Sequence, residues 1–265
     1  MASAPQSISM PLFYNDLVPL NSTEHGKFRS RGTDRAPWLI GQHAVPLTAE
    51  EFPLAQRHFP IVFSGGPEPV PLALMGMNEG VNVFVDEDGK VTENIYVPAY
   101  VRRYPFMLAK LRAESDDLSL CFDPTTDLIG EFEDGIPLFE NDEPTESCKA
   151  SLAFCEQFEI AAKKTANFVA ELLKHDLLMD GEVNLQLEGQ EQPFNYRGFS
   201  MINEQKLRGM RGDVLRSWNQ NGMLPLIHAH LFSLELVREV FGRQVIQGKG
   251  PIPAPAPADA QTESA

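Results

Sequence analysis

The chain has 265 residues, 43% of them hydrophobic and 22% charged, so it is long enough to bury a substantial core. Its 22 Lys and Arg residues stand against 37 Asp and Glu residues, and the resulting net charge of −15 repels phosphate backbones and argues against a nucleic-acid partner. No run of eighteen apolar residues and no secretory signal in residues 1–9 is visible, so we expect no membrane span and no export. The three cysteines, Cys121, Cys148 and Cys155, favour reduced thiols in the cytoplasm over a disulfide.

Composition along the chain predicts one domain with flexible N- and C-terminal segments. Residues 1–10 are polar and are expected to be flexible, and residues 11–243 form a single interwoven domain that begins with an edge strand within 12–18. Residues 244–265 carry repeated Pro and Ala and are expected to form a disordered tail.

Residues 21–35 form a basic loop in an otherwise acidic protein. The loop contains Lys27, Arg29, Arg31 and Arg35. It is either an anion-recognition loop or, as is commoner for charge runs, a solvated connection with ordinary surface arginines.

An antiparallel meander is predicted next. Thr48 precedes two glutamates and is typical of a helix N-cap, which opens a short helix over 48–58. Apolar runs over 59–63, 71–76 and 81–85 are separated by turn residues and predict three strands.

The densest cluster of unusual residues is segment 96–106, which contains two prolines, three tyrosines and an arginine pair. Pro98 suits the first turn of a helix, and Pro105 is expected to kink that helix, whose apolar face continues to residue 113. Arg102 and Arg103 could grip an anion, and Tyr96, Tyr100 and Tyr104 could stack on a planar ligand; the alternative is that the segment cements two layers of a core. If Arg103 is a surface anion clamp, Arg103→Ala costs less than about 1 kcal/mol of stability.

The second half of the chain predicts one long helix among shorter elements. A strand over 118–122 leads to an acidic loop over 127–144, whose carboxylates could hold a cation but fit a solvated loop better. Apolar spacings of three and four predict a helix over 145–179 that crosses the sheet, with a coiled-coil homodimer as an alternative. Further patterns predict two strands and two helices, over 183–188, 194–201, 203–218 and 234–241.

His228 and His230 are the candidate metal ligands. Residues two apart on a strand point to one face, where both imidazoles could bind iron or zinc, whereas on a helix they would diverge. The remaining ligands could only be guessed, from Glu204, His175 or His43, and ordinary core or surface histidines are the alternative. The hydrolase, metalloprotease, redox and dinucleotide motifs are missing from the sequence, so its residues assign no cofactor and no catalytic chemistry.

The chain resembles the bacterial SapC family, named for a protein associated with surface-layer loci, from about residue 12 to residue 243. The stretches that carry the resemblance are 59–63, 96–106, 118–123, 137–139 with 143–144, 198–199 and 222–234. The resemblance implies a protein often encoded near TonB-dependent receptors and flavin-dependent halogenase-like proteins, and it implies no catalytic mechanism.

The combined expectation is an α+β fold in which an antiparallel or mixed sheet is packed by one long helix and several short ones. We expect an accessory protein that binds a small molecule or peptide through Arg102, Arg103, Tyr104, Tyr100 and Tyr96, with a halogenase-like or receptor-locus protein as a partner. The alternatives are an enzyme that uses the same arginines and tyrosines, with His228 and His230 as metal ligands, and a structural surface-layer protein.

Overall fold

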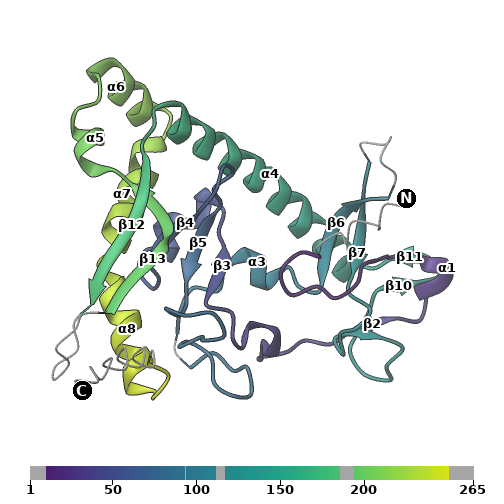
Figure 1. Ribbon diagram of the computed structural model, residues 1–265. Helices are drawn as coiled ribbons and strands as arrows, with labels where there is room; N and C mark the ends of the chain where they lie inside the picture. The colour runs from purple at the N-terminus through teal and green to yellow at the C-terminus, as the bar shows by residue number, and fades with distance from the viewer. Residues whose placement is uncertain (1–9, 93, 112–116, 186–193, 251–265) are drawn as a thin grey trace, which may run out of the picture.

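The structure is a computed structural model that describes residues 10–92, 94–111, 117–185 and 194–250 (Figure 1). Its helices and 3₁₀ helices are α1 (Ser22–His25), η1 (Pro37–Leu39), η2 (Ala49–Glu51), α2 (Phe52–Ala55), α3 (Ala99–Arg102), α4 (Glu146–Lys174), α5 (Glu204–Arg208), α6 (Gly212–Gln220), α7 (Met223–Ser233) and α8 (Leu236–Ile246).

The strands of the described residues form four antiparallel sheets. The largest has the order β12 (Leu178–Leu185), β13 (Phe194–Ile202), β4 (Ile61–Ser64), β5 (Pro71–Leu74) and β3 (Ala44–Pro46). The smaller sheets are β1 (Val18–Pro19), β7 (Leu118–Phe122) and β6 (Phe106–Lys110); β8 (Ile129–Gly130), β2 (Arg29–Ser30) and β9 (Ile136–Pro137); and β10 (Phe139–Glu140) with β11 (Glu143–Pro144). These sheets, with α4 and the shorter helices, confirm the predicted α+β class.

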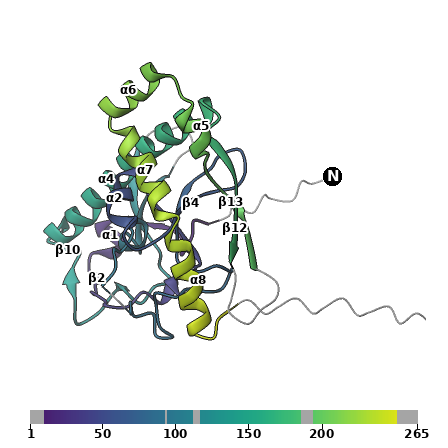
Figure 2. The same ribbon diagram turned by 90° about the vertical axis from the view of Figure 1, so that its left-hand side faces the viewer.

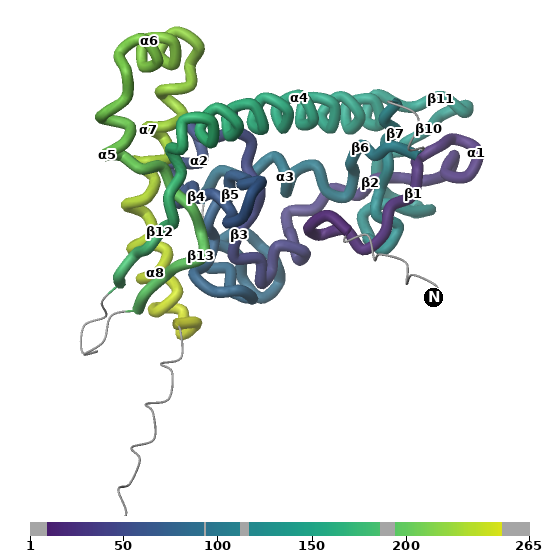
Figure 3. The backbone as a smooth tube through the Cα atoms, turned by 45° about the horizontal axis from the view of Figure 1, so that its top comes forward, coloured from purple at the N-terminus to yellow at the C-terminus, as the bar shows by residue number. Residues whose placement is uncertain are grey.

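Two hydrophobic cores lie at the two ends of α4. The first core joins the five-stranded sheet to α7, α8 and the second half of α4, which contributes Phe168, Val169 and Leu172. The second core lies under β6 and β7 and receives Cys148 and Cys155 from the first half of α4. Figure 3 shows α4 running along one side of the molecule between these two groups of elements, and Figure 2 shows α7 and α8 following one another on the side that faces the viewer.

Helix α4 is fixed to the rest of the fold at several points. At its N-terminus the side chain of Thr145 accepts a hydrogen bond from the backbone N–H of Cys148. Midway, the Thr165 hydroxyl accepts from the backbone N–H of Ala49 at 2.8 Å and donates to the carbonyl of Ala161 at 2.7 Å, which ties α4 to η2.

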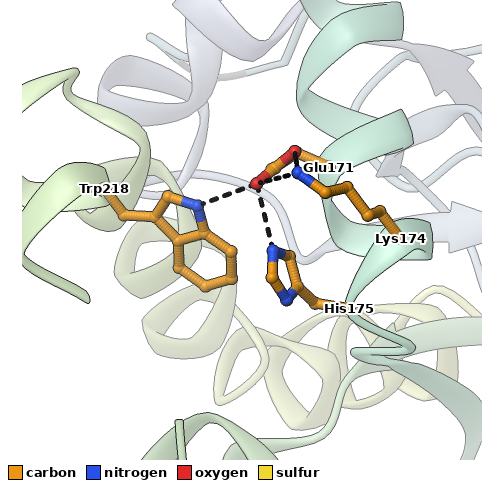
Figure 4. Close-up of polar contacts among 4 residues, drawn as sticks. All are labelled: Glu171, Lys174, His175 and Trp218. Carbon is orange, nitrogen blue, oxygen red and sulfur yellow. Dashed lines mark hydrogen bonds and ion pairs between the residues drawn. The ribbon is translucent and has the colours of Figure 1, made fainter. Parts of the chain in front are cut away.

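The C-terminal end of α4 is held to α6 through Glu171 (Figure 4). Glu171 Oε1 lies 3.4 Å from Nε1 of the buried Trp218 and 3.1 Å from Nε2 of His175, and Lys174 Nζ lies 3.0 Å from Oε2. The hydrogen bond from Lys174, partly offset by desolvation and assisted by those from Trp218 and His175, lowers the pKa of the Glu171 carboxyl. The cluster gives the indole N–H of Trp218 an acceptor at the edge of the first core.

Several element predictions were wrong, each for a physical reason. After a cis peptide bond between Tyr104 and Pro105 the chain enters strand β6 rather than a helix, and Phe106 and Leu108 alternate with outward-facing residues against β7. Residues 81–85 form no strand: the Asn82 side chain donates to the carbonyls of Leu39 and Gln42 and accepts from the N–H of Phe84, which fixes an irregular loop.

The C-terminal third also differs in its boundaries. Helix α4 ends at Lys174 rather than at residue 179, because the chain reverses at Asp176, whose φ is 50°, and β12 begins at Leu178. The helix predicted over 203–218 is two helices, α5 and α6, separated at Gly209. The acidic loop over 127–144 contains the short strands β8 to β11, and α8 continues to Ile246. Residues 1–9 and 251–265 lie outside the described residues.

Candidate functional site

Segment 96–106 is anchored by Glu51, a buried residue at the end of η2. Glu51 Oε2 accepts hydrogen bonds from the backbone N–H and the hydroxyl of Thr48, at 2.8 and 2.9 Å. Its Oε1 accepts from the Tyr96 hydroxyl at 2.9 Å and from the backbone N–H of Ala99, in the first turn of α3, at 2.6 Å. One carboxylate therefore caps η2 and the start of α3 together.

The Glu51 contact extends to Arg102 through Tyr96. Arg102 Nη2 lies 3.3 Å from the Tyr96 hydroxyl oxygen, and its guanidinium lies 5.7 Å from the centre of the Tyr96 ring and 5.2 Å from that of Phe154. Arg102 is exposed and makes no ion pair with the described residues. It is therefore a positioned cation that can bind an external anion.

Arg103 is buried, so the premise of a surface anion clamp was wrong. Its side chain is 5% exposed and its guanidinium lies 4.3 Å from the ring centre of Tyr100 and 4.2 Å from that of Phe158. Glu159 Oε1 lies 3.5 Å from Nη1, at the long end of a hydrogen bond, and Nε has no acceptor among the described residues. Arg103 therefore packs as part of the core while one of its donors stays unused.

The burial of Arg103 changes the expected effect of its replacement. Arg103→Ala removes two ring contacts and leaves a cavity, so we expect it to cost about 2–4 kcal/mol in the free energy of unfolding, measured by urea denaturation. The matched variant is Arg102→Ala, at the exposed neighbour, which we expect to cost less than about 1 kcal/mol. Equal and small losses in both variants would contradict the packing role of Arg103.

Arg102 and Tyr104 line a cavity of about 530 Å³, which we call the arginine cavity. The basic loop supplies Arg31 and Arg35 to its wall, and Trp38 of η1 lies against Tyr104 with ring centres 4.5 Å apart. The indole Nε1 of Trp38 is buried and has no hydrogen-bond partner among the described residues. The cavity thus joins three guanidinium groups to an aromatic wall.

The three arginines of the cavity are not equivalent. Arg31 is paired with Asp134 at 2.5 Å and lies over the Phe132 ring at 3.7 Å, and Arg35 lies 3.5 Å from Asp88. Both pairs are exposed and contribute little to stability, but they compensate the charge of their arginines. Arg102 is therefore the cation of this cavity with the least charge compensation.

The tyrosines of segment 96–106 remain protonated at neutral pH. Burial, reinforced by the Glu51 carboxylate, raises the pKa of Tyr96 to about 12, and burial also raises the pKa of Tyr100 and Tyr104. Their hydroxyls can serve as hydrogen-bond donors, and they are poorly suited to act as general bases near pH 7.

The structure brings only part of the predicted site together. Arg102 and Tyr104 line the arginine cavity, and the Tyr96 hydroxyl accepts a hydrogen bond from Arg102. Tyr100 lines a separate apolar cavity of about 560 Å³ between α4 and residues 67–71. Sequence reasoning missed Trp38, which it treated as an apolar residue after the basic loop. The loop composition was the only signal available, since 67 residues separate Arg35 from Arg102.

Both His228 and His230 lie on helix α7, so the strand arrangement that would turn the two imidazoles to one face does not occur. His230 is fully buried: its Nε2 accepts from the backbone N–H of Ile202 at 3.1 Å and its Nδ1 donates to the carbonyl of Ile61 at 2.8 Å. His228 Nδ1 lies 2.9 Å from the carbonyl of Leu224 in its own helix. Within the described ranges, no group of three or more His, Cys, Asp or Glu side chains is placed to hold a metal ion.

These features define an α+β protein with an arginine-lined aromatic cavity. Across the part of the chain that the structure describes, no helix has both the length and the apolar character needed to cross a bilayer. The family model of SapC matches residues 20–240, and the chain therefore belongs to the SapC family. Comparisons with curated proteins and with solved structures each give no match.

Proposed function

We propose that this protein binds a small anionic molecule with a planar group, in the arginine cavity. The observation that carries the proposal is Arg102, a cation that forms no ion pair with the described residues and lies beside two rings, at the edge of a cavity with an aromatic wall, in a protein of net charge −15. A cavity of about 530 Å³ is within the usual size of small-molecule sites.

The acid group of the ligand would pair with Arg102, and its planar part would lie against Trp38 and Tyr104. The guanidinium of Arg102 can form a bidentate pair with a carboxylate or a phosphate, which gives orientation as well as affinity. The ring pair supplies apolar contact area for a planar group. The surrounding negative charge disfavours ligands that place several anionic groups outside the cavity.

In the cell, we propose an accessory role in the cytoplasm beside receptor-locus or halogenase-like proteins. Support for this setting comes from the resemblance described above and from the three cysteines, which are free and buried. A protein of this kind would hold a small molecule or the end of a peptide for a partner that acts on it.

The proposal predicts a charge-dependent binding of planar acids. We expect 4-nitrobenzoate to quench the fluorescence of Trp38 and to bind at least about tenfold more tightly than the uncharged 4-nitrobenzamide, because a charge-assisted hydrogen bond contributes about 1.5–3 kcal/mol. Arg102→Gln is expected to abolish this preference. Binding is measured by fluorescence titration and checked by calorimetry.

Two variants make the binding test specific. Arg211→Gln alters an exposed arginine that pairs with Asp213 on α6, and it should bind 4-nitrobenzoate like the wild type. Trp38→Phe should retain calorimetric binding and lose the quenching, since Trp218 lies buried beside Glu171. Unchanged binding in Arg102→Gln would refute the proposal.

A further inference from the structure

A second, smaller cavity of about 280 Å³ adjoins the site, and we call it the inner cavity. It lies between segment 96–106 and the first turns of α4, and its polar walls are Arg102, Arg103, Ser147 and Ser151. It shares Arg102, Phe106 and Ser151 with the arginine cavity. One molecule of moderate size can therefore contact the walls of both cavities.

Arg103 enters this wall with an incomplete set of partners. Its side chain is only 5% exposed, and its Nε has no acceptor within the described residues. Within the described part of the chain, its one ion pair is the 3.5 Å contact with Glu159, whose side chain is 39% exposed. A buried cation that is paired only through this long contact is costly, and an anion in the inner cavity, whose wall Arg103 helps to form, would offset that cost.

The guanidinium of Arg103 cannot easily turn away to find another acceptor. Tyr100 and Phe158 flank it at 4.3 and 4.2 Å, and Tyr14 lies at 5.9 Å. Such a fixed guanidinium loses little conformational freedom when it binds an anion.

Helix α4 adds favourable groups to the same wall. Ser147 and Ser151 belong to its first two turns, and the Ser151 hydroxyl donates to the carbonyl of Ser147 at 3.1 Å. The N-terminus of a helix of 29 residues carries a partial positive charge, which favours an anion near these serines. Hydroxyls and arginine forks are the groups that proteins use for carboxylate and phosphate oxygens.

We infer that the inner cavity binds an oxyanion, the carboxylate or phosphate group of the ligand, which pairs with Arg102 as proposed above and also contacts Arg103 and the serines of α4. The inference rests on the proposed function in one respect: the same ligand would place its planar part on Trp38 and Tyr104. It specifies the ligand class as a planar molecule with a terminal oxyanion that reaches past Arg102. The small volume of the inner cavity fits an acid group and a few attached atoms.

The test observes the unused donor itself. In the full chain labelled with ¹⁵N-arginine, the Nε–H resonance of Arg103 is followed by NMR during titration with inorganic phosphate, and separately with acetate. We expect a saturable shift with at least one of them, and the tighter of the two identifies the oxyanion. Sodium chloride at equal ionic strength is the control, and the Nε–H of Arg211, already bound to Asp213 at 3.0 Å, is the internal reference.

Variants of the serines connect the shift to this cavity. Ser147→Ala and Ser151→Ala are each expected to lower the affinity for the oxyanion at least threefold. Ser217→Ala, at an exposed position of α6, should leave that affinity unchanged. If Arg103 shifts no more than Arg211, or if the serine variants leave the affinity unchanged, the inference is overturned.

The outcome separates this inference from the proposed function. Binding of 4-nitrobenzoate through Arg102 without a response at Arg103 would overturn the oxyanion site and leave the proposed function intact. A saturable phosphate or acetate shift at Arg103 in a protein that does not bind 4-nitrobenzoate would establish the oxyanion site and overturn the proposed function.

Discussion

Replacing His230 by alanine is expected to lower the free energy of unfolding by about 3–5 kcal/mol. The register of β13 and β4 pairs Phe199 with Ser64 and Ser200 with Phe63, so its continuation would place Ile202 opposite Ile61. At that position the imidazole of His230 lies between the strands, and it joins the N–H of Ile202 to the carbonyl of Ile61. Alanine would leave both backbone groups buried and unsatisfied beside a cavity.

The same residue should make the stability fall in mild acid. Burial lowers the pKa of His230 to about 4, against 6.5 in the unfolded chain. Between these values the unfolded state binds a proton that the native state does not, so the free energy of unfolding decreases as the pH falls from about 6.5 to about 4. The difference of 2.5 pH units corresponds to about 3 kcal/mol at most.

Urea denaturation at several pH values measures both effects. His230→Asn keeps a donor and an acceptor but does not titrate, and it should flatten the pH dependence between 4 and 6.5. His228→Ala, two residues earlier on the same helix and partly exposed, should cost less than about 1 kcal/mol and keep the wild-type slope. A wild-type slope in His230→Asn would show that another group is responsible.

Replacing Glu51 by alanine is the second large effect that we expect, about 3–5 kcal/mol. The substitution removes four hydrogen bonds at once, from Thr48 N–H and hydroxyl, the Tyr96 hydroxyl and the Ala99 N–H. Glu51 is 6% exposed, so water cannot easily replace its carboxylate. The loss would also release Tyr96, the residue that holds Arg102.

Glu50→Ala is the matched control for Glu51→Ala. Glu50 is the preceding residue, it is exposed, and its ion pair with Lys164 is a surface pair at 2.6 Å, so we expect a loss of less than about 1 kcal/mol. Both variants are compared by urea denaturation and by their affinity for 4-nitrobenzoate. A Glu51→Ala variant as stable as Glu50→Ala would show that the four hydrogen bonds contribute little.

Sequence patterns could predict the class of fold because its longest elements are locally consistent. The broad apolar stripe over 145–179 and the strand predicted over 194–201 each agree with what these segments form, α4 and β13. The patterns failed for short apolar runs that fit both the two-residue period of a strand and the 3.6-residue period of a helix. Residues 106–110 were predicted to be helical and form β6, and the apolar run around His228 and His230, which its pattern assigned to neither strand nor helix, is α7.

The candidate site could be predicted only in part, because its members come from distant segments. The sequence singled out segment 96–106 as a candidate site and the basic loop as a second cationic region, and the structure places Arg102 and Tyr104 of that segment at the wall of the arginine cavity. Neither pattern indicates that the two meet, or that Arg103 points into the core while its neighbour stays exposed. Both facts depend on α4, because its Phe158 ring contacts the guanidinium of Arg103 and its Phe154 ring contacts that of Arg102.

The first core contains residues from the first 85 positions together with residues of α7 and α8, so it cannot form until both parts of the chain have been synthesised. Both backbone groups of Ile61 bind α7, where Ser233 accepts from the N–H and His230 donates to the carbonyl, and the N–H of Met77 donates to Gln244 of α8 at 2.8 Å. The first 85 residues therefore cannot complete this core until residue 246 has been synthesised. At about 5–20 residues per second, synthesis from residue 85 to residue 246 takes roughly 8 to 32 s. During that interval the apolar strands β4 and β5 lack their covering helices, and we expect the nascent chain to depend on chaperones.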